Sequence, residues 1–294
     1  MASGQVRRYK IGKVSIGKRA DVFVTEQLPK FSRSALKGLF DKNLVTLNDN
    51  DVKAGHKLSS GDTLKVDTSL LSVVPEPIDI PVIYEDKDVI VMNKPAGVLT
   101  HSKGILNTEP TVASFIEPKL TNKSLKGNRA GIVHRLDRAT SGVIIAAKNE
   151  SALKYLQNQF STRKVEKTYL AVVEGVPLPA EAIVDAPIER NPKKPQTFRV
   201  GANGRPAQTR YKVLKMLSGS SNLSLLELRP MTGRTHQLRV HLKYIGHPIA
   251  GDHIYGHGDE NMYLHAKSLE VTLPGGRWMK FEAAEPKIFK DFCR

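Results

Sequence analysis

The chain has 294 residues, of which 40% are hydrophobic, and its length fits one or two domains. Lysine and arginine number 45 and aspartate and glutamate 29, a formal net charge of +16, which favours a polyanionic partner, nucleic acid ahead of an anionic membrane surface. The single cysteine, Cys293, excludes an internal disulfide and a thiolate metal site. The N-terminus lacks the apolar core of a signal peptide, and no apolar run approaches the roughly 18 residues of a membrane span, so we expect a cytoplasmic protein.

The first predicted domain covers residues 16–74 and follows a basic extension over residues 1–15. The segment SRSALKGLFDKN predicts a helix that begins at the capping residue Ser32 and has apolar side chains on one face. Arg33 and Lys37 lie towards the other side of this helix. Short strands follow, separated by Asn-Asp and Ser-Gly-Asp turns. The pattern predicts a small α/β domain.

The segment PEPIDIP indicates a stiff, proline-rich linker over residues 75–82, and a larger domain follows over residues 83–294. Helices are predicted in SALKYLQNQF and THQLRVHLKYIG, and strands in VIVMN, KTYLAVV and LSLLELR. Residues 191–210 are basic and rich in turn formers, which predicts a mobile hairpin that could touch RNA. Because strands outnumber helices and do not alternate with them, we expect an α+β fold with a mixed, largely antiparallel sheet.

Three motifs point to other chemistry and were set aside. Residues 12–18 nearly form a phosphate-binding P-loop, but Arg19 stands where the motif needs a magnesium-binding hydroxyl. The histidines lack the spacing of zinc hydrolases, since His236 and His241 are five residues apart, and we interpret most of them as packing or surface residues. Ser141 lies outside the G-x-S-x-G turn of hydrolases, which gives a serine triad little support.

Residues 131–149, GIVHRLDRATSGVIIAAKN, place one carboxylate between two arginines where one apolar run would otherwise lead into another. The neighbouring charges of Arg135 and Arg138 favour the ionised form of Asp137. Such an aspartate either forms a structural salt bridge or serves as a rigidly held catalytic group. The basic first domain, the arginine-rich RPMTGRTHQLRVH and the aromatic residue in EKTYLAV favour catalysis on RNA.

HRLDRATSGVIIAAK resembles the signature of the RluA-type pseudouridine synthases. Further motifs of that family follow in order along nearly the whole chain: KPAGVLTH, KTYLAVVEG, GRPAQTRYKVL, RPMTGRTHQLRVHLKYIGHPIAGDHIYG and LHAKSLEV. Residues 16–74 resemble the S-four RNA-binding domain that precedes the catalytic domain in RluC- and RluD-like members. The chain departs from the family at Ser102, where many members have proline, and in the wording near the C-terminus.

The resemblance implies an enzyme that isomerises uridine in RNA to pseudouridine in a central RNA-binding cleft, without cofactor or metal. The bond from ribose to nitrogen 1 of the base breaks, the base turns, and carbon 5 is joined to the ribose. Asp137 corresponds to the catalytic carboxylate, acting either as a nucleophile or as a base towards a glycal intermediate. Tyr169 corresponds to the tyrosine that stacks on the base, and Arg239 to the arginine paired with the aspartate.

Arg135 corresponds to the residue that fills the gap left by a flipped uridine. RNA contacts are assigned to Arg135, His134, Arg138 and Arg234 in the large domain and to Arg33 and Lys37 in the small one. Large-subunit ribosomal RNA, in ribosomal precursor particles, is the leading substrate and transfer RNA the second, with the protein acting as a monomer and away from membranes. Two other functions stay open: a non-catalytic RNA-binding or ribosome-assembly protein, and an RNA glycosylase that admits water and releases uracil.

Overall fold

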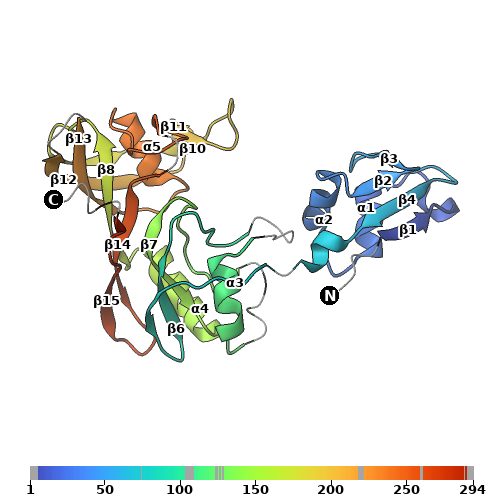
Figure 1. The fold of residues 1–294 in the computed structure, drawn as a ribbon, viewed down its shortest axis with the longest axis horizontal. Coiled ribbons are helices and arrows are strands. Elements are labelled where there is room, and N and C mark those ends of the chain that lie inside the picture. The colour runs from blue at the N-terminus through green and yellow to red at the C-terminus, as the bar shows by residue number, and fades with distance from the viewer. Residues whose placement is uncertain are drawn as a thin grey trace. The chain divides into compact units, whose positions relative to one another are not determined.

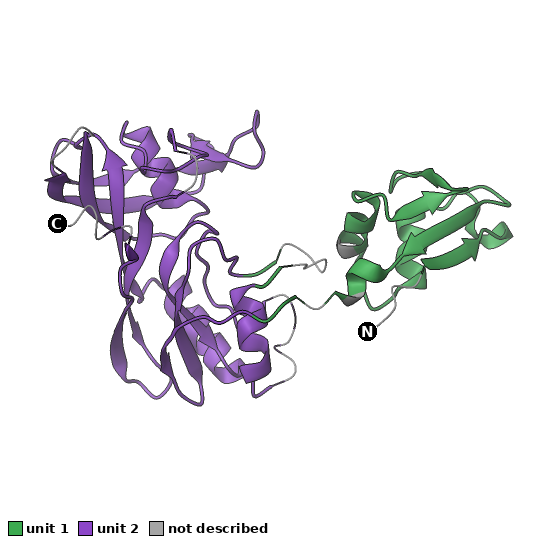
Figure 2. Cartoon of the chain, in the orientation of Figure 1, with its two compact units in different colours: residues 1–77, 101–110 green, residues 78–100, 111–294 purple. Residues whose placement is uncertain are grey.

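The computed structural model describes residues 6–73, 75–102, 109–122, 125, 127, 129–217, 222–258, 261–287 and 289; Cys293 lies outside them. The chain divides into two compact units (Figure 2). The N-terminal unit comprises Met1–Pro77 with His101–Pro110, and the larger unit comprises Ile78–Thr100 with Thr111–Arg294. The larger unit contains the motifs that the resemblance associates with catalysis, and it is called the catalytic unit after that expectation. No helix in the described part of the chain is long and apolar enough to cross a membrane.

The N-terminal unit pairs two short helices with a four-stranded antiparallel sheet that has the strand order β1-β4-β2-β3 (Figure 1). The strands are β1 (Val6–Lys10), β2 (Val45–Leu47), β3 (Asn50–Asp51) and β4 (Thr63–Asp67), and the helices are α1 (Ala20–Gln27) and α2 (Arg33–Phe40). Single 3₁₀ turns lie at η1 (Lys13–Ser15) and η2 (Ser69–Ser72). The unit has a hydrophobic core of its own, which includes Phe23, Leu36, Leu39, Leu58 and Leu64.

Two features of this unit differ from the sequence-based expectation. The sequence predicts an extension over residues 1–15, whereas β1 pairs with β4 in register from Val6 to Lys10, and Ile11 is buried in the core. Helix α1 was not anticipated, because its sequence ADVFVTEQ holds three β-branched residues, which lower helix propensity. Its stability comes instead from packing, since Phe23 and Val24 are buried in the core.

The catalytic unit is built on a nine-stranded sheet in the order β5-β6-β7-β14-β8-β13-β12-β9, with β15 paired to β14 (Figure 1). Its strands are β5 (Val82–Glu85), β6 (Val89–Lys94), β7 (Ser141–Ala147), β8 (Glu166–Glu174), β9 (Glu181–Asp185), β12 (Gln208–Leu217), β13 (Leu223–Pro230), β14 (Leu264–Thr272) and β15 (Trp278–Glu282). Neighbours pair antiparallel except β7 and β14, which run parallel. This confirms the predicted α+β fold with a mixed, largely antiparallel sheet.

Helices and a small hairpin complete this unit: α3 (Val112–Ile116), η3 (Glu117–Lys119), α4 (Glu150–Ser161), α5 (Gln237–Tyr244), β10 (Ile188–Arg190) and β11 (Phe198–Val200). Helix α4 begins after Asn149, whose side chain accepts the backbone N–H of Ala152. Helix α5 ends before Gly246, which has the left-handed backbone, φ +85°, common after helices. The predicted helices at these positions are confirmed. Strand β11 lies in the predicted basic segment and pairs with β10, which ends just before that segment begins.

The segment predicted as a linker over residues 75–82 contributes to the larger unit. The boundary between the units falls after Pro77, Ile80 is buried, and Ile78 packs against the same hydrophobic cluster. Val82 already begins β5. Two isoleucines at alternate positions therefore anchor the end of this segment in the core of the catalytic unit.

Strand β7 fixes the position of the residues that precede it, which include Asp137. All seven of its residues are buried, and it lies between β6 and β14. Gly142 has φ +113°, and a Cβ atom there would lie 2.2 Å from the carbonyl oxygen of Ala266, so only glycine fits where the two parallel strands meet. The residues immediately before β7 therefore emerge from a rigid part of the sheet.

Candidate active site

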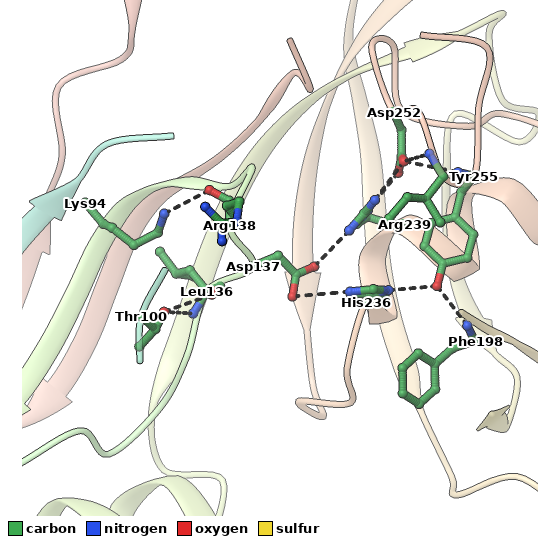
Figure 3. Close-up of polar contacts among 11 residues, drawn as sticks. Lys94, Thr100, Leu136, Asp137, Arg138, Phe198, His236, Arg239, Asp252 and Tyr255 are labelled. Carbon is green, nitrogen blue, oxygen red and sulfur yellow. Dashed lines mark hydrogen bonds and ion pairs between the residues drawn. The ribbon is translucent and has the colours of Figure 1, made fainter. Parts of the chain in front are cut away.

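Asp137 lies in the signature loop, residues 133–140, which leads into β7. Just before Asp137, the backbone N–H of Leu136 donates to Thr100 Oγ1 over 3.1 Å, and the Thr100 hydroxyl donates to the Leu136 carbonyl over 2.8 Å. Both residues are buried. A reciprocal pair of hydrogen bonds thus fixes the backbone on the N-terminal side of Asp137 (Figure 3).

Lys94, at the end of β6, holds the loop on the other side of Asp137. Its Nζ donates to the carbonyl oxygens of Pro95, Val98 and Arg138 over 2.8, 2.7 and 3.2 Å. Burial lowers the pKa of Lys94 to about 7, and the negative charge of Asp137 acts in the opposite direction. Because three carbonyls match the three hydrogens of a protonated ammonium, Lys94 ties the turn after β6 to the residue next to Asp137.

The carboxylate of Asp137 faces Arg239 and His236, which come from α5 and the residue before it (Figure 3). Arg239 Nη1 lies 3.4 Å from Asp137 Oδ2, and His236 Nε2 lies 3.9 Å from Asp137 Oδ1. The sequence suggests that Arg135 and Arg138 provide the positive charge beside this carboxylate. The resemblance pairs Arg239 with it, and the structure has that contact although Arg239 is 102 residues away along the chain.

Arg239 is itself held by Asp252. Its Nε and Nη2 donate to the two carboxylate oxygens of Asp252 over 2.7 and 2.8 Å, and both side chains are buried. Asp252 Oδ1 also accepts the backbone N–H groups of Ile254 and Tyr255. Burial acts to raise the pKa of Asp252, but the bonds from Arg239 outweigh it and the pKa lies below its usual value. One guanidinium therefore bridges two carboxylates and directs Nη1 at Asp137.

Tyr169 lies in β8 and lines the same cleft as Asp137. Its ring packs against two hydrophobic clusters of the catalytic unit. Burial raises the pKa of Tyr169, and Asp137 raises it further, so the hydroxyl keeps its proton at neutral pH. The hydroxyl forms no hydrogen bond with any residue that the structure describes, and it is not a buried unpaired atom. It is therefore available to a group bound in the cleft.

A cleft of about 920 Å³ surrounds these residues. Asp137, Tyr169 and Arg239 all line it, so the three residues assigned to catalysis lie together although they come from different parts of the chain. The walls are rich in cationic side chains: Arg135, Arg163, Lys167, Arg210, Arg229 and Arg234. A basic cleft with a carboxylate in its wall suits a polyanion that must meet a negative charge at one point.

The residues assigned to RNA in the catalytic unit occupy different positions. Arg135, Arg234 and His134 line the cleft, with Arg135 exposed. Arg234 is oriented by a bond of 3.1 Å from its Nε to the carbonyl of Pro206. Arg138 is not among the lining residues that the structure describes; its Nη1 lies 3.3 Å from the carbonyl oxygen of Gly97 in the turn after β6.

The side chain of His134 contacts residues outside the loop, in β7 and α4. Its Nε2 accepts the backbone N–H of Ile145 over 3.1 Å, and its ring stacks on Phe160 with 4.6 Å between centroids. Burial lowers the pKa of His134 to about 3, and the charge of Lys167 lowers it further. The ring is therefore neutral at physiological pH. An RNA contact by His134 stays a prediction, and this geometry gives it no charge to offer a phosphate.

Arg33 and Lys37 lie on α2 of the N-terminal unit, and both are exposed. Arg33 is not a free cation, because its guanidinium shares the buried carboxylate of Asp21 with Arg19, at 2.9 and 3.1 Å. The hydrogen bond from Arg19 is the largest cause that lowers the pKa of Asp21. The assignment of Arg33 and Lys37 to RNA stays a prediction.

Sequence reasoning missed Lys94, Thr100, His236, Asp252 and Tyr255. The motifs that contain them were recognised, but no role was given to these positions. A signal existed for two of them: Lys94 directly follows the apolar segment VIVMN, and Asp252 directly follows the apolar PIAG. A charged residue in such surroundings is buried only when it is paired.

The serine and the histidines that could suggest a hydrolase or a metal site have structural contacts. Ser141 Oγ lies 2.9 Å from His265 Nδ1, but the other nitrogen of this histidine faces the carbonyl of Ala283, where a triad would place a carboxylate. His241 is buried and bonded through both nitrogens, to Thr209 and Ala186. In the described part of the chain, no group of three or more potential ligands could hold a metal ion.

Residues 88–244 match the RNA pseudouridylate synthase family. This stretch spans more than half of the chain and includes Asp137, Tyr169 and Arg239. The chain belongs to this family. Its members are isomerases that convert uridine in RNA to pseudouridine.

The match extends to whole proteins. The chain is 38% identical to an uncharacterized RNA pseudouridine synthase of Aquifex aeolicus, over 92% of each protein. It is 36% identical to ribosomal large subunit pseudouridine synthase D of Borreliella burgdorferi, over 93% of this chain and 88% of that protein. The solved structure of human RNA pseudouridylate synthase domain containing 1 is similar with a TM-score of 0.59 and 28% identity, over 72% of this chain and 86% of that one.

Proposed function

We propose that this pseudouridine synthase acts on large-subunit ribosomal RNA and that Asp137 is its catalytic carboxylate. The observation that carries the assignment is the arrangement of Asp137, Arg239 and Asp252 in the wall of a basic cleft. Asp252 neutralises most of the charge of Arg239, so Asp137 keeps its own negative charge while Arg239 fixes its direction. The name of the Borreliella relative supports the ribosomal substrate.

The reaction needs this type of group at this place. When the bond from the ribose to nitrogen 1 of uracil breaks, the sugar becomes positively charged, and a fixed carboxylate stabilises that charge. Carbon 5 then bonds to the ribose, its hydrogen leaves as a proton, and nitrogen 1 gains one. Lys94 and Thr100 hold the loop on both sides of Asp137, so the carboxylate need not reorient during the reaction.

The remaining assigned residues act on the base and on the RNA. Tyr169 supplies a ring for the flipped base to stack on and a protonated hydroxyl near the reacting atoms. Arg135, exposed at the cleft, is placed to occupy the space that a flipped uridine leaves in the RNA. The other cationic side chains of the cleft face phosphates on either side of the uridine. Two of them, Arg210 and Arg229, also pair with Glu181 and Glu227.

We assign the N-terminal unit to RNA binding as an S-four-type domain that now includes β1, and residues 78–294 without 101–110 to catalysis. Arg19 and Arg33 leave one positive charge in excess around Asp21, on a surface that includes the exposed Lys37. A cation cluster on a small domain suits RNA phosphates. Every residue that the mechanism uses comes from one chain, so a monomer suffices, and a cytoplasmic location gives access to ribosomal precursor particles.

The proposal is tested with purified protein and RNA labelled with tritium at carbon 5 of uridine. Isomerisation releases the label to water, so release is expected from large-subunit ribosomal RNA at a rate well above that from transfer RNA. Faster release from transfer RNA would make transfer RNA, and not ribosomal RNA, the assigned substrate. No release from any RNA, at concentrations where the protein binds it, would favour a non-catalytic binding protein.

The same reaction mixtures distinguish isomerisation from cleavage. An isomerase leaves pseudouridine in the RNA in an amount equal to the tritium released, with the chain intact. An RNA glycosylase would instead release free uracil and leave abasic sites. Nucleoside analysis of the digested RNA and of the soluble fraction measures both products.

A further inference from the structure

His236 has a position that the assigned mechanism does not use. Its Nε2 lies 3.9 Å from Asp137 Oδ1, whereas Arg239 occupies the other oxygen, Oδ2. A distance of 3.9 Å is too long for a direct hydrogen bond, so the ring edge stands beside Oδ1 without engaging it. Arg239 occupies Oδ2, which leaves Oδ1 facing the cleft with His236 beside it (Figure 3).

The hydrogen on His236 can be placed from its neighbours. His236 Nδ1 lies 2.8 Å from the hydroxyl oxygen of Tyr255, and the same oxygen accepts the backbone N–H of Phe198 over 2.9 Å. The hydroxyl has one hydrogen, and within the described residues Nδ1 is the acceptor in reach, so Tyr255 donates to Nδ1. A neutral His236 therefore has its hydrogen on Nε2, the nitrogen that faces Asp137.

The surroundings keep the ring neutral. Burial lowers the pKa of His236, and it outweighs Asp137, which raises it. The other charged groups that act on the ring are Arg239 and Arg135, which lower the pKa, and Asp252, which raises it. At physiological pH, His236 thus offers a single uncharged N–H donor through Nε2.

The backbone at His236 has an uncommon conformation. Its φ is 55°, in the left-handed region, which is strained for most residues other than glycine and is easiest for asparagine. A histidine in this conformation immediately before α5 turns its ring towards the cleft, and the edge of the ring packs against Phe198 and Tyr255. Strain of this kind clusters at functional sites.

We propose that His236 is a further catalytic residue, whose Nε2–H donates a hydrogen bond to the uracil ring as it separates from the ribose. The inference rests on the proposed function, because it assigns a further residue to the same reaction. When the bond from nitrogen 1 to the ribose breaks, its electron pair stays on uracil, and the negative charge spreads to the carbonyl oxygens. Asp137 stabilises the cationic sugar and His236 the anionic base, while Tyr255 fixes which nitrogen of His236 donates.

The test compares three variants with the wild-type protein. His236→Asn suits the left-handed backbone and keeps a polar group near Tyr255, but it has no donor that reaches the Nε2 position. We expect its single-turnover rate at saturating RNA to fall roughly 100-fold, the scale of losing one donor to a developing anion, with unchanged RNA affinity. His236→Gln, which extends an amide N–H to that position, should recover at least a tenth of the wild-type rate.

His241→Asn is the matched control, because His241 is a buried histidine of α5, the helix that His236 precedes, and among the described residues its ring bonds to Thr209 and Ala186. It should lower the melting temperature and leave the rate per folded molecule unchanged. If His236→Asn behaves in the same way, or if the asparagine and glutamine variants are equally slow, His236 is a packing residue and the inference is wrong. A wild-type protein that releases no tritium would overturn the proposed function itself, which is a different result.

Discussion

In each unit of the chain, a buried aspartate pairs with arginine, but the ratio of the two residue types differs. Two arginines share one aspartate in the N-terminal unit, and one arginine contacts two aspartates in the catalytic unit. In the N-terminal unit, Arg19 and Arg33 share Asp21, and their side chains are 49% and 51% exposed. In the catalytic unit, one arginine, Arg239, bridges Asp252 and Asp137 and is only 4% exposed. The first cluster has a positive charge in excess at the surface, and the second a negative charge in a cleft.

The comparison shows how the same residue types serve two purposes. Exposed guanidinium groups can still meet phosphates, because water and RNA compete for the hydrogens that Asp21 does not use. A buried guanidinium between two carboxylates cannot bind RNA strongly, but it orders the carboxylate that faces the cleft. The number of aspartates for each arginine, together with burial, therefore separates an RNA-binding surface from a catalytic site.

Removing the carboxylate of the catalytic cluster that faces the cleft should have the largest effect. In Asp137→Asn, the amide keeps the shape but supplies neither negative charge nor nucleophile. We expect the single-turnover rate to fall on the order of 10⁴-fold or more, the scale of losing a catalytic nucleophile. Tritium release measures the rate, and RNA affinity and melting temperature should stay close to those of the wild-type protein. Residual turnover above a tenth of the wild-type rate would remove Asp137 from its role.

Tyr169→Phe keeps both clusters intact and removes one hydroxyl from the cleft. Because this hydroxyl has no partner among the described residues, its loss should change the free energy of unfolding by less than about 1.5 kcal/mol. The turnover rate should fall roughly 100-fold, within the range of general acid–base catalysis, with RNA binding retained. Melting temperature and rate are measured on one preparation. A variant that melts early but turns over normally would place Tyr169 in the core.

Asp252→Asn and Asp21→Asn compare the two clusters directly. The first leaves the guanidinium of Arg239 buried without its bidentate partner, which should cost about 3–5 kcal/mol in the free energy of unfolding. The turnover rate should fall about tenfold or more, because Arg239 no longer has a fixed direction.

Asp21→Asn is the control for this prediction. Water can solvate the two half-exposed arginines, so we expect a loss of about 1–2 kcal/mol and no change in the rate at saturating RNA. Chemical denaturation and single-turnover kinetics measure both variants. Equal losses of stability and of rate in the two variants would contradict the distinction between the clusters.

Deleting residues 1–77 should have the smallest effect on chemistry. The catalytic unit keeps its own cores, so it should stay folded and retain its rate at saturating RNA. Its RNA affinity should fall about tenfold or more, and the salt dependence of binding should become shallower, because phosphate-neutralising cations are lost. Binding titrations over a range of salt concentrations test this. An unchanged slope would show that the N-terminal unit does not hold the substrate.

Much of the fold was predictable because it depends on local patterns. Helices α4 and α5 follow from apolar residues at helical spacing, and β6, β8 and β13 from short apolar runs between turns. The order β7-β14-β8 was not predictable, since β14 enters the sheet between strands that precede it by many residues. Local periodicity does not encode which strands become neighbours.

The site, like the fold, was predictable only where it depends on local sequence patterns. Asp137, Tyr169 and Arg239 were found because each lies in a recognisable motif. The groups that position them were missed, because their contacts join distant segments: Lys94 is 44 residues from Arg138, and the turn that contains Asp252 lies 13 residues after Arg239. Which carbonyls Lys94 meets depends on the folded sheet, and nothing in its sequence neighbourhood specifies them.

The most direct test of the central claim is pseudouridine mapping of ribosomal RNA from cells that lack this protein. At least one uridine of large-subunit ribosomal RNA should lose its modification, and the wild-type chain should restore it. The Asp137→Asn chain, produced at the same level, should leave that position unmodified. An unchanged pseudouridine pattern in the deleted cells, or full restoration by Asp137→Asn, would contradict the account.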